Sequence, residues 1–109
     1  MKAIIIYQET DERGTMTTGG IYEGITEKEA RESVVAYNNT LIFYIPLTVS
    51  GKTYAERAAD LRNKAIEYQS SWYDFCGFSY GELAIIQNFF ERNGKRYGLL
   101  KEFRENAIC

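Results

Sequence analysis

The sequence predicts one α+β domain in which a small sheet of two to three strands is packed by about four helices. Two apolar runs rich in β-branched residues, 2–8 and 41–47, predict strands in the first half of the chain. From residue 53 onward the apolar residues follow helical spacing, so the C-terminal half is expected to be all helical. Segregated strands and helices favour α+β over a doubly wound parallel sheet. At 109 residues, the chain is expected to form a single compact domain, 1–109.

The strands are predicted from short apolar runs and from the residues that interrupt them. Residues 2–8 are typical of a strand buried on both faces, and Pro46 stands near the exit of the 41–47 strand, where a missing N–H does little harm. Residues 15–18 either pair with the first strand as an edge or belong to a loop, and Gly19-Gly20 indicates a flexible turn. A helix crossing between 2–8 and 41–47 would make these two strands parallel.

Helix starts are predicted from three capping boxes, in which a Ser or Thr is followed three residues later by Glu. These pairs are Thr26 with Glu29, Thr53 with Glu56, and Ser79 with Glu82. The second helix is the longest and is expected to run to about Tyr73. Asn93-Gly94 predicts the end of the third helix, and a fourth is expected from about Lys95 to Asn106.

Enzyme chemistry is largely excluded by composition. The chain has no histidine, which removes the commonest general base and the Ser/His and Cys/His nucleophile pairs. Cys76 precedes a helix start and is open to interpretation as a reactive thiol, but no base is available to it, and a small apolar residue between Phe75 and Phe78 is the simpler interpretation. The carboxylates lack the spacing of a calcium loop, and no glycine-rich phosphate loop is present. We expect no enzyme activity, no metal and no cofactor.

Cysteine usage and the first residues predict a cytoplasmic protein. Only four apolar residues precede Tyr7 and Gln8, too few for a signal peptide or a membrane span. Cys76 and Cys109 are therefore expected to be free thiols, and no membrane partner is expected.

The charge balance predicts a binding surface of mild acidity. The net charge is −2, whereas phosphate-gripping proteins are usually basic and DNA mimics far more acidic. An alternative interpretation is a helix-turn-helix nucleic-acid module over residues 79–106, because basic side chains follow the expected turn. These side chains are Arg92, Lys95, Arg96, Lys101 and Arg104.

Nine tyrosines exceed what a core of this size needs, and tyrosine is enriched at recognition surfaces. The aromatic cluster around residues 68–80 is expected to be half core and half partner contact. Together with acidic residues of the first half, it supplies the predicted partner-binding set: Asp11, Glu12, Glu23, Glu27, Tyr73, Phe75, Phe78 and Tyr80.

A small, mildly acidic, histidine-free domain with many aromatic residues and no catalytic motif resembles, in kind, the accessory proteins of bacteriophages and mobile elements. Among these it is similar in type to anti-CRISPR and other anti-defence inhibitors. The resemblance implies a non-enzymatic inhibitor that docks on a host nucleic-acid-handling protein, such as a CRISPR effector nuclease, in the cytoplasm of the host cell. The most distinctive string, Ser79 to Leu100, is not a motif of assigned function, so the resemblance assigns no functional residue.

Overall fold

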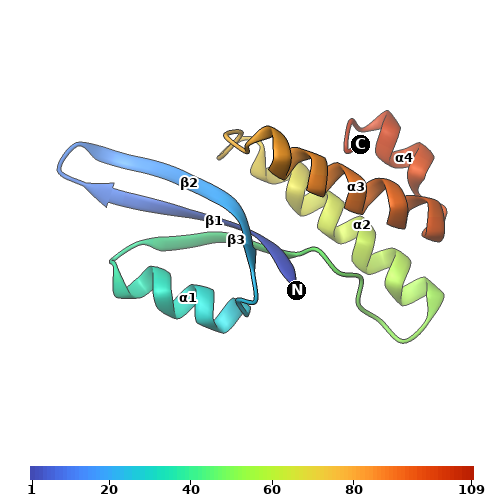
Figure 1. The fold of residues 1–109 in the computed structure, drawn as a ribbon, viewed down its shortest axis with the longest axis horizontal. Coiled ribbons are helices and arrows are strands. Elements are labelled where there is room, and N and C mark those ends of the chain that lie inside the picture. The colour runs from blue at the N-terminus through green and yellow to red at the C-terminus, as the bar shows by residue number, and fades with distance from the viewer.

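The computed structural model describes residues 1–109 and has three strands and four helices; one helix lies between the second and third strands, and the other three follow the third strand (Figure 1). The elements are β1 (Lys2–Asp11), β2 (Gly14–Glu23), α1 (Glu27–Ala36), β3 (Thr40–Pro46), α2 (Tyr54–Ser71), α3 (Tyr80–Tyr97) and α4 (Leu100–Glu105). The α+β class and the all-helical C-terminal half are confirmed.

The sheet has the strand order β2-β1-β3, and both pairings are antiparallel. Parallel pairing of the two apolar strands, expected from the sequence, is therefore wrong. The physical reason is β2, which reverses the chain once more before α1 begins. Helix α1 consequently connects β2 to β3, the two edge strands, which run parallel to each other with β1 between them.

Strand β2 is longer than the expected 15–18 segment and contains Gly19 and Gly20 in its interior rather than in a turn. A Cβ on Gly19 would lie 2.8 Å from Cδ1 of Phe75, and one on Gly20 would lie 3.0 Å from Oε2 of Glu82. The two glycines thus allow the α2–α3 loop and the start of α3 to approach the strand closely.

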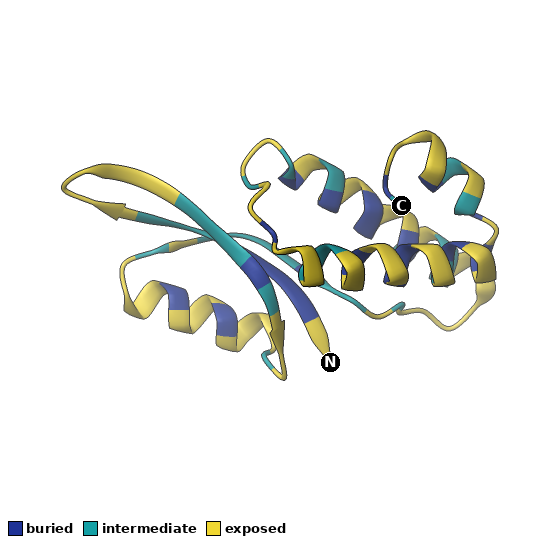
Figure 2. Cartoon of the chain, turned by 45° about the horizontal axis from the view of Figure 1, so that its top comes forward, coloured by how far each residue is buried: buried dark blue, intermediate teal, exposed yellow.

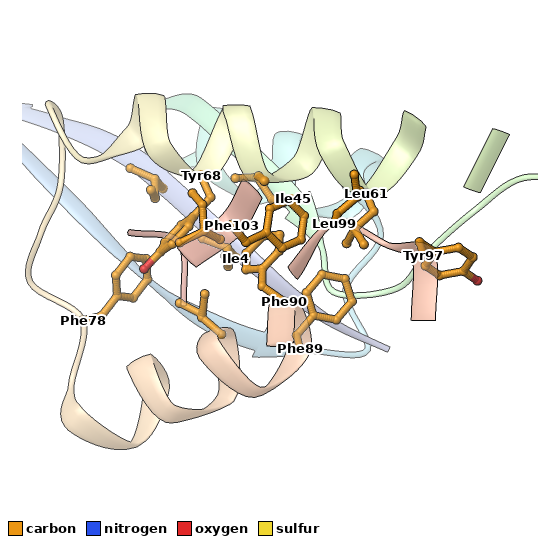
Figure 3. Close-up of a cluster of buried hydrophobic side chains, with 14 residues drawn as sticks. Ile4, Ile45, Leu61, Tyr68, Phe78, Phe89, Phe90, Tyr97, Leu99 and Phe103 are labelled. Carbon is orange, nitrogen blue, oxygen red and sulfur yellow. The ribbon is translucent and has the colours of Figure 1, made fainter. Parts of the chain in front are cut away.

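The two faces of β1 serve two separate cores. Ala3 and Ile5 pack with Ala30 of α1 in a small core. Ile4 and Ile6 point to the opposite face, where they join a larger core formed with Ile45 and the helices α2 to α4. Figure 2 shows the buried residues of each helix gathered on the side that faces the rest of the molecule. Figure 3 shows the larger core, in which aromatic side chains of α2, α3 and α4 meet.

The helical half differs from expectation at its turn. Helix α3 continues through Asn93-Gly94 and ends at Tyr97, and Gly98 caps it with a left-handed φ of 72°. Gly94 instead allows close packing. A Cβ at this position would lie 3.0 Å from Cδ2 of Phe103, so the lack of a side chain lets α4 fold back onto α3. As a result α4 begins at Leu100, five residues later than expected.

The molecule is elongated, with extents of 47 × 27 × 20 Å. The β1–β2 hairpin projects away from the helices α2 to α4, as the left side of Figure 1 shows. Its tip, residues 10–16, is exposed. The acidic residues Asp11 and Glu12 therefore lie at one end of the long axis, where a partner can reach them.

Candidate binding groove

An open groove of about 470 Å³ lies between α1 and the sheet. Its lining includes three tyrosines from three different elements: Tyr7 from β1, Tyr22 from β2 and Tyr37 at the C-terminal end of α1. Ile5 and Val34 supply apolar surface, and Glu29 is the charged residue of the lining. The volume lies within the range of about 300–1,000 Å³ that is typical of ligand pockets. We call this feature the tyrosine groove.

The groove exists because α1 covers this face of the sheet unevenly. The helix packs on β3, and the hydroxyl of Tyr44 on β3 donates a hydrogen bond to the carbonyl of Ile25, which fixes the start of α1. On the other side of β1, Gly20 pairs with Ile5 and brings no side chain to the shared face. The part of the sheet between α1 and β2 therefore stays open.

The tyrosines of the groove combine apolar surface with accessible hydroxyls. Tyr22 is 37% exposed and Tyr37 is 77% exposed, whereas Tyr7 is half-buried. Burial raises the pKa of Tyr7, and the neighbouring Tyr22 hydroxyl and Glu9 carboxylate raise it further. The Tyr7 hydroxyl consequently remains protonated and neutral well above neutral pH.

The charge of the groove is negative. Glu29 is held in place by its backbone N–H, which donates to Oγ1 of Thr26 at 3.2 Å, but its carboxylate accepts no hydrogen bond from the cap and forms no ion pair. The nearby Glu27 is already paired with Arg31 at 3.0 Å. No basic residue belongs to the lining. The tyrosine groove thus offers one unneutralised carboxylate among aromatic rings.

The acidic residues predicted from the sequence are all exposed. Asp11 and Glu12 lie at the hairpin tip, where Oδ1 of Asp11 accepts a hydrogen bond from the Arg13 N–H at 2.7 Å. Glu23 ends β2 and Glu27 begins α1, so these two flank the short connection that leads into the groove. The structure places all four on the β-rich part of the molecule.

The predicted aromatic anchors divide between the core and the surface. Phe78 is buried, and its ring meets that of Phe75 edge-on at 4.9 Å. Phe75 is half-buried because it packs on Gly19. Tyr73 and Tyr80 are 95% and 92% exposed and lie free at the surface. Tyr73 and Tyr80 are therefore the most accessible of the four anchors.

The basic residues of the predicted helix-turn-helix nucleic-acid module do not form a recognition helix. Lys95 and Arg96 lie in the last turn of α3 instead of the first turn of a second helix. Lys95 and Arg104 both approach Oε1 of Glu91, each at 3.9 Å. The other two members of the set, Arg92 and Lys101, are exposed on α3 and α4.

One basic residue does join a cluster that the sequence did not indicate. Arg96 lines a shallow hollow of about 350 Å³ together with Lys52 and Arg57, beside the Tyr54 and Tyr97 rings. None of the three cations forms an ion pair, although Nε of Arg57 donates to the Gly51 carbonyl at 3.0 Å. This basic hollow lies at the junction of α2 and α3.

The tyrosine groove does not follow from local sequence patterns. The sequence places Tyr22 outside the predicted strands and indicates only a capping role for Glu29. The proximity follows from the hairpin register, in which Ala3 pairs with Tyr22 and Tyr7 lies four residues beyond Ala3 on the same strand face. Predicting this proximity required the hairpin register, which the glycine pair obscured.

Both cysteines are free, Cys76 exposed and Cys109 half-buried. Burial raises the pKa of the Cys109 thiol, and Glu91 raises it further, against the opposing effect of Arg104. We expect Cys76 to react faster than Cys109 with iodoacetamide near pH 8, and the ratio of rates to narrow as the pH rises, because more Cys109 becomes thiolate. Peptide mass spectrometry over time measures both rates. Equal rates at pH 8, or a disulfide in the unreduced protein, would contradict this.

The chain shows neither a metal cluster nor a helix suited to a membrane. No three His, Cys, Asp or Glu residues gather where they could hold a metal ion. None of the helices combines the length and the apolar character needed to cross a bilayer. Comparison with protein-family models, with curated proteins and with solved structures gave no match.

Proposed function

We propose that the protein is a non-enzymatic binding protein that docks on a nucleic-acid-handling partner, such as a CRISPR effector nuclease, and inhibits it by occlusion. The observation that carries this proposal is the tyrosine groove with its unneutralised Glu29 carboxylate. Proteins that handle nucleic acids present basic surfaces to phosphate groups. An acidic and aromatic face is complementary to such a surface.

In the proposed contact, the groove and the hairpin affect different rate constants of binding. Tyrosines in a partly enclosed site give a partner large contact area and few rotatable bonds, so we expect them to govern the rate of dissociation. The exposed charges of Asp11 and Glu12 project from the molecule, so we expect them to govern the rate of association through electrostatic attraction.

The experiment uses the full chain immobilised to capture proteins from a bacterial lysate, followed by purification of each captured protein and measurement of binding kinetics. We expect Tyr22→Ala to raise Kd about 30-fold, mainly through faster dissociation, which corresponds to about 2 kcal/mol. The double variant Asp11→Lys/Glu12→Lys should slow association and weaken its dependence on salt. A nuclease assay on the purified partner then tests for inhibition.

Tyr73→Ala and Tyr80→Ala test the exposed members of the partner-binding set predicted from the sequence, since each removes a tyrosine outside the groove. Affinity loss confined to Tyr73→Ala or Tyr80→Ala would move the contact to the α2–α3 loop. Wild-type affinity in the Tyr22 and hairpin variants, together with loss in Lys95→Glu or Arg96→Glu, would overturn the proposal.

Nucleic-acid binding is the second candidate, and the basic hollow is the observation that favours it. Lys52, Arg57 and Arg96 present three cations without ion pairs to one hollow. If the hollow contacts phosphates, the affinity for DNA should fall steeply with salt, and Arg96→Glu should reduce the slope of log K against log salt by about 1. Absence of binding at low salt would exclude this candidate.

A further inference from the structure

Three tyrosines and one carboxylate line the same groove, a combination of residue types suited to a cation. We propose that the tyrosine groove binds the guanidinium group of an arginine side chain presented by a protein partner. This inference rests on the proposed function, because it names the chemistry by which the partner is recognised. The residues that carry it are Tyr7, Tyr22, Tyr37 and Glu29.

The aromatic rings supply the first part of the recognition. The face of a tyrosine ring is electronegative, so a cation near it is attracted electrostatically, and arginine is the commoner partner in proteins. The guanidinium is also flat and more weakly hydrated than an ammonium group, so it stacks on a ring at lower cost. Because the three rings come from β1, β2 and α1, they line the groove from more than one side.

Glu29 supplies the second part. The neighbouring cation Arg31 is engaged with Glu27, and no basic residue lines the groove, so the Glu29 carboxylate lacks a partner within the chain. Two N–H groups of a guanidinium match the two oxygens of a carboxylate. The groove is open, which limits the cost of removing both charges from water. A phosphate or a carboxylate ligand would be repelled by the same group.

The other residues that line the groove suit the methylene groups of the arginine side chain and the flanking peptide. Ile5 and Val34 offer apolar surface to the methylene groups of an arginine side chain, which bury their stem while the charged end stays hydrated. Ser33 and Asn39 also line the groove, and their side-chain oxygens can accept hydrogen bonds from further N–H groups of the ligand. The volume of about 470 Å³ leaves room for the flanking peptide as well.

The test is an NMR titration of the full chain, labelled with ¹³C in its tyrosine rings, with the capped peptide acetyl-Gly-Arg-Gly-amide. The same peptide with citrulline, which is nearly the same shape but neutral, is the matched ligand control, and the lysine peptide is the third arm. We expect the arginine peptide to shift the ring signals of Tyr7, Tyr22 and Tyr37 and to bind about fivefold or more tightly than the citrulline peptide.

Two variants test the residues. Glu29→Gln keeps the backbone N–H that donates to Thr26 and should weaken arginine binding about fivefold without affecting the citrulline peptide. Tyr22→Leu should weaken arginine binding by a similar factor. Tyr54→Leu, which removes a ring outside the groove, should leave it unchanged. Amide spectra confirm that each variant is folded.

Equal binding of the arginine and citrulline peptides, equal binding of the lysine peptide, or wild-type binding by Glu29→Gln would overturn the inference. The proposed function fails separately. If the captured partner loses affinity for Tyr22→Ala while the arginine peptide does not bind, docking at the groove stands and the arginine assignment falls. If the peptide binds at the groove and Tyr22→Ala does not change the affinity for the partner, the arginine assignment stands and docking of the partner at the groove falls.

Discussion

Replacing Phe90 by alanine is expected to lower the free energy of unfolding by about 3–5 kcal/mol. Phe90 is fully buried on α3, and its ring lies 5.6 Å from that of Tyr68 on α2 and 5.6 Å from that of Phe103 on α4. One side chain therefore joins three helices, and its loss leaves a cavity that neighbouring aromatic rings cannot easily fill. Urea unfolding followed by circular dichroism measures the change.

Tyr80→Ala is the control for this experiment, because it removes an aromatic ring of similar size from the surface of the same helix. Its effect should lie within about 0.5 kcal/mol. A loss below about 1 kcal/mol for Phe90→Ala would mean that the three helices do not share the core described here.

Replacing Glu82 by alanine is expected to cost about 2–3 kcal/mol, since its carboxylate holds two parts of the fold together. Oε2 accepts a hydrogen bond from the Ile21 N–H of β2 at 2.7 Å, and Oε1 accepts one from the Ser79 N–H at 2.9 Å. The contact with Ile21 also occupies part of the open edge of β2. Glu82 thus caps α3 and attaches that helix to the sheet.

The same carboxylate makes stability depend on pH. The backbone N–H of Ser79 lowers the pKa of Glu82, aided by that of Ile21 and opposed by burial. Because its pKa in the folded state lies below the value near 4.5 in the unfolded chain, Glu82 contributes stability above that pH and loses it as the pH falls through the folded-state pKa. The stability difference between wild type and Glu82→Gln should therefore shrink below about pH 4.5.

Urea titrations between pH 7 and pH 3 measure this difference, with Glu105→Gln as an exposed control on α4 that should change stability little. A difference between wild type and Glu82→Gln that stays constant over this range would show that the charge of Glu82 plays no part in attaching α3 to β2.

Helix starts could be predicted from the sequence because they depend on neighbouring residues. Thr53 with Glu56 and Ser79 with Glu82 form complete capping boxes in the structure. Oγ1 of Thr26 accepts a hydrogen bond from the Glu29 N–H, but the reciprocal bond, from the Thr26 N–H to the Glu29 carboxylate, is not made. This half-made box is what leaves the Glu29 carboxylate free for the groove, and only the structure distinguishes it from the other two.

The roles of Gly19-Gly20 and Asn93-Gly94 could not be predicted from the sequence because they depend on distant residues. Gly19-Gly20 and Asn93-Gly94 look locally like turns. In the fold, Gly19 accommodates Phe75 and Gly94 accommodates Phe103, so both pairs lie inside regular elements. Because the sequence does not predict a strand over the whole of β2, it predicts neither the antiparallel topology nor the position of Tyr22.

Amide hydrogen exchange with and without a captured partner tests whether docking occurs at the tyrosine groove. The proposed docking predicts protection of residues 5–7 and 20–39, which supply the lining of the tyrosine groove, and of the hairpin tip, with little change in the exposed α2–α3 loop. Protection confined to residues 72–80, or to residues 92–104 and the basic hollow, would contradict it.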